Sequence, residues 1–229
     1  MNPDNIVTRA AVYIIPLVIA IVFHEVAHGW TARALGDPTA HERRRLSLNP
    51  LRHVDPVGTL VLPLGLALAH LPVFGWAKPV PVDARRLREP RTGMMLVAAA
   101  GPATNFALAL AAAVVLGLSW GPTGGQGATG WAQFWLANVT NFLMINVFLA
   151  LFNLLPFPPF DGGHIVQGLL PRPLAIRWAA FARYAMLAAI LLIVVLPMVA
   201  PQWNVVARVV GPIADSVAGG YLRVADWIA

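Results

Sequence analysis

The chain has 229 residues, of which 58 % are hydrophobic and 11 % are charged. An ordinary soluble domain carries about 25 % charged residues, so the composition excludes that class and indicates a membrane protein. The chain has no cysteine, which excludes disulfides and thiolate metal sites and leaves imidazole and carboxylate groups as metal ligands. The formal net charge is +6, but the basic residues lie in loops between apolar segments, which argues against nucleic-acid binding.

Four apolar segments approach or exceed the roughly 20 residues needed to cross a membrane. In chain order, we predict membrane-spanning helices at about 7–35, 92–120, 131–155 and 178–199. The N-terminus carries little positive charge and does not resemble a cleaved signal, so we expect the first helix to be retained. The sequence therefore predicts an all-α polytopic membrane protein whose residues 1–229 form a single domain.

The segment 57–74 is apolar, but prolines interrupt it and basic residues flank it on both sides. Of the 16 arginines and lysines, 13 fall in residues 33–52, 78–91 and 172–183, and the loop 119–131 has none. Because basic loops stay in the cytoplasm, both ends of 57–74 should lie on that side. We therefore predict a re-entrant segment rather than a short span, and an integral membrane protein whose basic loops face the cytoplasm.

Two further segments follow from proline and charge patterns. Residues 74–82 contain prolines that exclude a helix interior, and we predict an extended conformation there. The tail, 203–229, mixes valines with charged residues. This pattern predicts an amphipathic helix at the membrane interface. Together with the predicted spans, it makes the lipid bilayer an expected partner of the chain.

The motif His24-Glu25-Val26-Ala27-His28 lies inside the first apolar helix. Histidines four residues apart lie one turn apart on one helix face, so both imidazoles can bind the same zinc ion. Glu25 is placed to activate a water at that metal. A chance polar patch is the alternative, but these side chains at membrane depth would each be costly without a partner. The motif therefore predicts one zinc ion per chain.

A catalytic zinc ion takes three protein ligands and keeps one position for water, so a third ligand is required. Only two acidic residues lie within or against the apolar segments, Glu25 and Asp161. Asp161 follows prolines that break the third helix, and irregular backbone at this depth is tolerated where it lines a protein site. We predict Asp161 as the third ligand. The alternative, an N-cap for a helix starting at Gly162, can coexist with metal binding.

The predicted topology gives an independent check on this ligand set. If 57–74 is re-entrant, the second span starts on the cytoplasmic side and the third returns to it. Asp161 then lies at the end of the membrane where His24 and His28 lie. If 57–74 crossed fully, Asp161 would emerge on the far side. The charge pattern and the metal site therefore require the same topology.

Three motifs together resemble the site-2 protease family. They are His24 to His28 in one helix, Gly101-Pro102-Ala103-Thr104-Asn105 in a second, and Asn153 through Asp161-Gly162 at the end of a third. The resemblance implies an intramembrane zinc metalloprotease of a prokaryotic cell membrane, which cleaves a transmembrane protein substrate near the cytoplasmic face. His24, His28 and Asp161 match the family's metal ligands, and Glu25 matches its general base.

The resemblance also assigns a role to Asn153, which matches the asparagine of the family's third motif and could donate a hydrogen bond to the developing oxyanion. A hydrogen bond to a neighbouring helix is the alternative. Asn138, Asn146 and Asn153 lie on one stripe of the third helix, which should face the bundle interior. The remaining histidines match no catalytic position, and we expect surface or loop positions for them: His41, His53, His70 and His164.

The chain has no room for a PDZ or CBS domain, so it resembles a minimal member of the family. Residues 74–82 look like the family's membrane-edge strand. We expect free N–H groups at Trp76, Ala77 and Lys78 to bind an unwound substrate segment, with an interfacial loop as the alternative. Two other functions stay open, a structural zinc anchor and a zinc-binding transporter, although a transporter usually shows inverted repeats. The oligomeric state and the substrate's identity stay open as well.

Overall fold

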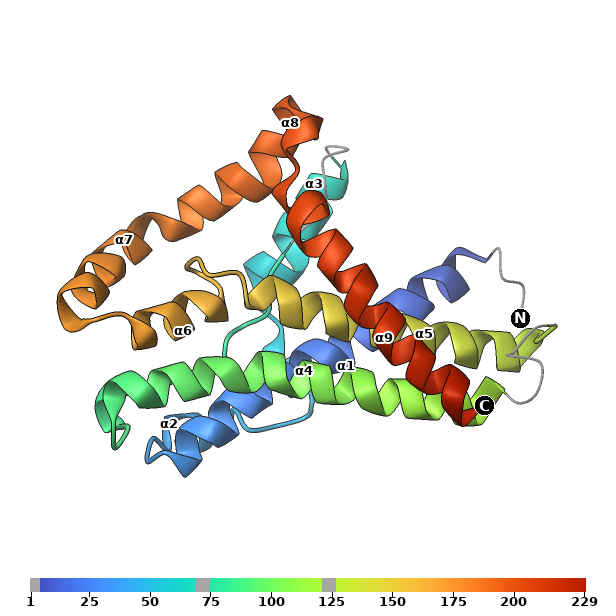
Figure 1. The fold of residues 1–229 in the computed structure, drawn as a ribbon, viewed down its shortest axis with the longest axis horizontal. Helices are drawn as coiled ribbons and strands as arrows, with labels where there is room; N and C mark the ends of the chain where they lie inside the picture. Colours follow the sequence, from blue (N-terminus) through green and yellow to red (C-terminus); the bar gives the residue numbers. More distant parts are fainter. Residues whose placement is uncertain (1–4, 69–74, 121–126) are drawn as a thin grey trace. The chain divides into compact units, whose positions relative to one another are not determined.

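The computed structural model describes residues 5–68, 75–120 and 127–229. Within these residues, four helical stretches are long and apolar enough to cross a membrane (Figure 1). They are α1 (Ile6–Ala34), α4 (Pro90–Trp120), α5 (Gly130–Asn153) and Arg172–Val199, which begins as α7 (Arg172–Ile190). The shortest has 24 residues, which is about 36 Å of helix and exceeds the roughly 30 Å of hydrocarbon. The four predicted spans are confirmed.

The chain divides into two compact units. The first contains Met1–Ala20, Pro102–Leu154 and Val205–Ala229, and the second contains Ile21–Gly101 and Leu155–Asn204. The helices α1 and α4 each contribute residues to both units. The single domain predicted from the sequence stays a prediction.

The core of the first unit is built from α5, the C-terminal part of α4, and α9 (Gly211–Ile228). Leu116 and Leu143 are fully buried in it. Figure 1 shows α9, in red, beside α5. The approach of α9 to α4 requires a glycine, because a Cβ at Gly117 would lie 2.5 Å from the Ala225 carbonyl oxygen. Small residues allow such close helix packing in membranes. The predicted position of the tail at the membrane interface stays a prediction.

Buried asparagines connect α4 and α5 within this unit. Asn105 and Asn146 are both fully buried, and Asn105 Nδ2 donates to Asn146 Oδ1 at 2.7 Å. Asn146 Nδ2 donates in turn to the Phe142 carbonyl at 2.7 Å. Each amide is thereby partnered, which a polar group away from water requires. The predicted inward orientation is confirmed for Asn146.

A buried aspartate, Asp37, connects the turn after α1 to the segment before α4 in the second unit. Thr39 donates its N–H (3.0 Å) and its hydroxyl to Asp37 Oδ1, and the Asp83 N–H donates to Oδ2 at 2.7 Å. Arg86 donates to Thr39 Oγ1 at 3.1 Å and pairs with Glu42 at 2.6 Å. The carboxylate therefore fixes two loops that the chain separates by more than forty residues.

The shorter helical elements of the second unit, in chain order, are α2 (Thr39–Glu42), Pro50–His53, Pro56–Val61, α3 (Leu62–Leu68), Ala84–Arg86, α6 (Asp161–Leu169), Leu191–Val195, α8 (Leu196–Val199) and Pro201–Trp203.

Three helical stretches of the described residues widen into a π-helical turn just before a proline. Pro56–Val61 precedes Pro63, Leu191–Val195 precedes Pro197, and Val206–Val210 precedes Pro212. A proline inside a helix has no N–H for the fourth residue before it, and its ring clashes with that carbonyl. A widened turn accommodates this clash. The fourth span therefore continues through Pro197 instead of breaking there.

Residues 75–83 form no strand, so the predicted edge strand is not found in the part of the chain that the structure describes. The Trp76 N–H donates to the Gly58 carbonyl at 3.1 Å, and the Lys78 N–H donates to the His53 carbonyl at 2.8 Å. The expectation that both N–H groups are free was therefore wrong, because the loop before α3 already binds them. Phe74 lies outside the described residues.

The predicted re-entrant segment, 57–74, is described only in its first part. It begins as a π-helical turn, Pro56–Val61, and continues as α3. The Asp55 side chain caps this start, because it accepts from the Val57 N–H at 3.0 Å and the Gly58 N–H at 2.7 Å. Residues 69–74 lie outside the described residues, and the path of the segment stays a prediction.

Candidate metal centre

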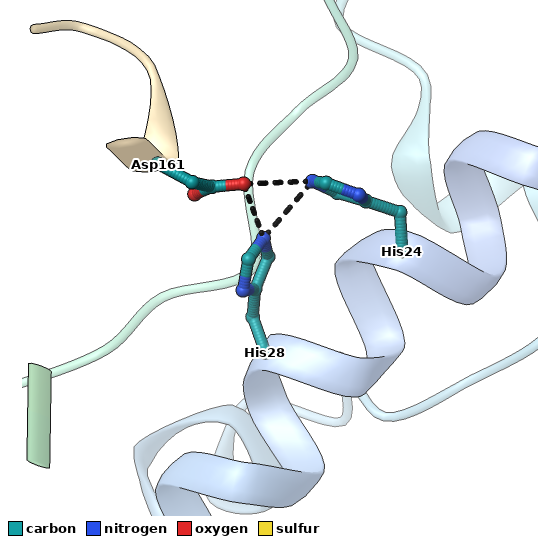
Figure 2. A group of neighbouring side chains, drawn as sticks. All are labelled: His24, His28 and Asp161. Carbon is teal, nitrogen blue, oxygen red and sulfur yellow. Dashed lines mark hydrogen bonds and ion pairs between the residues drawn. The ribbon is translucent and has the colours of Figure 1, made fainter. Parts of the chain in front are cut away.

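Figure 2 shows the imidazoles of His24 and His28, on α1, facing the carboxylate of Asp161 at the start of α6. The two Nε2 atoms are 3.0 Å apart. Asp161 Oδ2 lies 3.2 Å from His24 Nε2 and 3.4 Å from His28 Nε2. The structure thus brings together the three side chains that the sequence predicted as ligands. Among the described residues, no other cluster of His, Cys, Asp or Glu side chains is arranged to hold a metal ion.

The spacing of these three atoms fits a zinc ion. A tetrahedral site with metal–ligand distances of about 2.0–2.1 Å places neighbouring ligand atoms about 3.3 Å apart. Asp161 Oδ2 is buried and, within the described residues, accepts no well-directed hydrogen bond, although both imidazoles lie within ion-pair distance. Two imidazole nitrogens and one carboxylate oxygen are a catalytic zinc donor set that leaves a position for water.

The orientation of His28 is fixed from its other side. His28 Nδ1 lies 2.7 Å from the carbonyl oxygen of Val97 in α4. A carbonyl can only accept, so Nδ1 carries the proton and Nε2 presents its lone pair to the site. Such a partner behind a histidine ligand sets its tautomer and ring orientation.

Gly101 is a residue of the site whose role the sequence did not reveal. A Cβ at this position in α4 would lie 2.5 Å from Cε1 of His24 and 2.5 Å from Cε1 of His28. Both distances are far below van der Waals contact, so the two imidazoles need a glycine here. In the sequence, Gly101 and Pro102 begin the second motif of the family resemblance. The motif gave no physical reason for a glycine at residue 101.

Asp161 is the first residue of α6, and Phe160 is the N-cap. The alternative prediction of Asp161 as N-cap was therefore wrong. The first turn of α6 is held by the Trp178 indole, whose Nε1 donates to the Gly163 carbonyl at 3.0 Å. The backbone that carries the Asp161 carboxylate is thus fixed beside the two imidazoles.

Glu25 lies outside the three-atom cluster, and residues 75–83 hold its carboxylate. The Val80 N–H donates to Glu25 Oε2 at 2.8 Å. A prediction from the sequence could not include this bond, because 55 residues separate the two partners. The bond holds Glu25, the predicted base, against residues 75–83, the segment that follows α3.

Asn153 is the last residue of α5 and belongs to the first unit. Its Nδ2 donates to the Leu149 carbonyl, one turn back, at 2.9 Å. Its predicted role as an oxyanion donor stays a prediction.

The other histidines stand apart from the metal cluster. His53 ends the short helix Pro50–His53 and is buried, so the predicted surface or loop position was wrong for this residue; its Nε2 donates to the Ser47 carbonyl at 2.8 Å. His41 lies 3.4 Å from an Arg33 guanidinium nitrogen. His164 is exposed and lines a separate cavity. His70 lies outside the described residues.

Comparisons with known proteins show which family the chain belongs to. Residues 125–194 match the model of a family described as "Peptidase family M50". The chain is 36 % identical over 185 residues to the "Putative zinc metalloprotease YwhC" of Bacillus subtilis, which covers 79 % of each chain. No solved structure matches the chain.

Two proteins named "Putative zinc metalloprotease Rip2" are also similar. The chain is 32 % identical over 148 residues to that of Mycolicibacterium smegmatis, which covers 63 % of this chain and 51 % of the relative. It is 29 % identical over 187 residues to that of Mycobacterium tuberculosis H37Rv, which covers 78 % of this chain and 64 % of the relative. The chain thus spans about half to two thirds of these longer relatives. The extended match to YwhC and the match to the family model together show that this chain belongs to peptidase family M50, the site-2 protease family, and is a zinc metalloprotease with membrane-spanning helices.

Proposed function

We propose that this protein is an intramembrane protease that cleaves a peptide bond in or near a transmembrane segment of a membrane-protein substrate, close to the cytoplasmic face. One observation carries the proposal. His24 and His28 lie inside α1, a helix long and apolar enough to cross a membrane, with Asp161 beside them. A metal held there acts on peptide bonds at membrane depth. We assign His24, His28 and Asp161 as the three ligands of one zinc ion.

A bound zinc ion supplies a Lewis acid that activates water and polarises the scissile carbonyl. The chain itself provides the proton transfers. Glu25 is the general base: with Oε2 held by the Val80 N–H, Oε1 takes the proton from the attacking water and later delivers it to the leaving amine. The Val97 carbonyl keeps the His28 lone pair aimed at the metal during both steps.

The proposed cytoplasmic position of the site rests on the charge pattern and on two hydrogen bonds. The Trp76 N–H donates to the Gly58 carbonyl at 3.1 Å, and the Thr59 hydroxyl donates to the Trp76 carbonyl at 2.9 Å. The two ends of the segment between these residues therefore lie side by side, as a re-entrant path requires. A full crossing would place the ends about 30 Å apart.

We further propose that residues 75–83 bind the substrate's backbone on one side only. In an extended chain, successive N–H groups point to opposite sides. Because Trp76 and Lys78 donate to the preceding loop, the Ala77 N–H faces the other way and can pair with an unwound substrate. An Ala77→Pro variant should bind zinc normally and cleave much more slowly. Wild-type cleavage by a folded, zinc-loaded Ala77→Pro protein would exclude this binding mode.

The test of the protease assignment is a Glu25→Gln variant reconstituted in lipid vesicles with a transmembrane substrate. The substrate can be found among membrane proteins that accumulate in cells carrying the variant. We expect wild-type zinc content and cleavage lower by at least roughly a hundredfold, since general-base catalysis contributes 10²–10⁴. The alternative, a zinc-binding transporter or anchor without proteolytic activity, predicts that wild type and variant leave every membrane protein intact.

A further inference from the structure

A cavity of about 610 Å³ lies in the second unit where two membrane-spanning helices begin. Its lining comes from Ala84, from the N-terminal parts of α4 and α7, and from α6. The polar side chains that line it are Arg91, His164, Gln167 and Arg172. Among the residues that the structure describes, neither a candidate metal ligand nor an acidic residue lines it, so the cavity is distinct from the metal cluster.

The two arginines occupy electrostatically unfavourable positions. Arg91 is the second residue of α4, and Arg172 is the first of α7. Helix N-termini carry partial positive charge, so cations there are disfavoured and anions are favoured. Neither guanidinium makes a hydrogen bond or ion pair with the part of the chain that the structure describes, although Glu89 directly precedes α4. A bound anion would offset both arginines and both helix ends.

The rest of the lining is apolar and follows the two helices toward the membrane. Met94 lies one turn into α4, and Ala175, Ile176 and Ala179 lie one to two turns into α7. Ile176 is 71 % exposed. In the proposed topology both helices enter the membrane from this level, which places the charged end of the cavity at the depth of lipid headgroups and its apolar end at the depth of acyl chains.

We propose that this cavity binds an anionic phospholipid, with the lipid phosphate between Arg91 and Arg172 and an acyl chain along Met94 and Ile176. Basic pockets between membrane helices are known to take anionic headgroups. A free phosphate would bind the arginines but leave the apolar lining exposed. An acidic peptide has no acyl chain to pack against that lining. The proposal does not depend on proteolytic activity.

The experiment measures lipid retention by the purified full chain with native mass spectrometry, in detergent containing phosphatidylglycerol or phosphatidylcholine. The test variant is Arg91→Gln with Arg172→Gln. The matched control is Arg88→Gln with Arg177→Gln, which removes the same charge from neighbouring exposed arginines that do not line the cavity. Zinc content and thermal unfolding report that each variant is folded.

We expect wild type and control to prefer phosphatidylglycerol, and the test variant to bind it about thirtyfold more weakly, since each arginine near an anionic headgroup contributes roughly fivefold. An Ile176→Ser variant should also weaken phosphatidylglycerol binding, through the acyl chain. Equal losses in test and control variants would overturn the proposal in favour of general surface charge. Inorganic phosphate that binds as tightly as phosphatidylglycerol would show that the acyl chain contributes nothing, and would overturn it too.

Discussion

At the scale of single residues, the metal centre depends on a position that has no side chain. Gly101 lies against both imidazoles, and a Cβ there would come within 2.5 Å of ring carbons of His24 and His28. His28 cannot move away without losing its bond to Val97. We predict that Gly101→Ala lowers zinc affinity by roughly ten- to a hundredfold, the range seen when the support of a ligand is lost.

Zinc content per folded chain is the measurement for this variant. Gly219→Ala is its control, because a Cβ at Gly219, also in a helix, meets no atom within 4 Å. The control should retain zinc fully. A Gly101→Ala protein with wild-type zinc affinity would mean that the imidazoles can adapt to a side chain at residue 101.

The position of the general base gives a second prediction at this scale. The Val80→Pro change removes the N–H that holds Glu25 Oε2 and leaves the three metal ligands intact. We predict a cleavage rate lower by about a hundredfold, the cost of misplacing a catalytic group by roughly 1 Å, with wild-type zinc content. Val80→Ala keeps the N–H and should retain most activity. Equal rates for the Pro and Ala variants would show that this bond does not position the base.

The cluster of three candidate ligands could be predicted from the sequence, but the contacts that hold these side chains in place could not. Helical geometry alone places His24 beside His28, and the scarcity of acidic residues in apolar segments left Asp161 as the third ligand. The contacts of Gly101 and the bond from Val80 join residues far apart in the chain. They depend on how closely two segments approach, and sequence spacing carries no information on that distance.

At the scale of elements, Asp37 holds the loops around the metal-binding helix. It is fully buried and accepts bonds from Thr39 and Asp83. Each hydrogen bond to a charged group contributes about 1.5–3 kcal/mol. We predict that Asp37→Ala lowers the free energy of unfolding by roughly 3–5 kcal/mol, measured by thermal unfolding in detergent. Asp215→Ala, at an exposed residue, is the control. Equal unfolding temperatures for both variants would contradict this role.

The same carboxylate makes stability depend on pH. Burial raises the pKa of Asp37, but the hydrogen bonds from Thr39 and Asp83, with the Arg86 charge, outweigh it and hold that pKa below the usual 3.8. A carboxyl group whose pKa is lower in the folded state than in the unfolded state stabilises the folded protein. This stabilisation is complete at a pH above the pKa of the unfolded state and disappears as the pH falls through the pKa of the folded state. We predict that acid reduces the stability difference between wild type and Asp37→Ala, with the change confined to pH below about 4. A difference that stays constant into acid would contradict it.

The helices could be predicted from the sequence where local composition alone determines the secondary structure. Long apolar runs must form helices in a membrane, and the four spans lie close to their predicted bounds. The fourth span continues through Pro197 by means of a π-helical turn, and the hydrophobic pattern of the sequence does not predict that turn. The prediction of free N–H groups at Trp76 and Lys78 was wrong because these groups donate to the Gly58 and His53 carbonyls, a tertiary contact. The packing of α9 on α5 depends likewise on partners far away in the chain.

At the scale of the whole molecule, the proposed metal site requires one topology in the membrane. The chain has no cysteine, so single cysteines can be introduced as labels. We predict that cysteines at Ser47 and Thr92 react with a membrane-impermeant reagent from the cytoplasmic side, and that one at Thr123, outside the described residues, reacts from the other side. Labelling of positions 47 and 92 from opposite sides would contradict a re-entrant segment.

We propose above all that His24, His28 and Asp161 hold one catalytic zinc ion in a membrane-embedded protease. The most direct measurement is the zinc content of purified Asp161→Ala beside wild type and Asp226→Ala, a change at an exposed residue outside the site. We predict about one zinc ion per chain in wild type and in Asp226→Ala, since the described part of the chain contains one cluster of three candidate ligands. Asp161→Ala should lose most of its zinc and all measurable cleavage, because two imidazoles alone cannot complete the ligand set. Full zinc occupancy in a folded Asp161→Ala protein would contradict the claim.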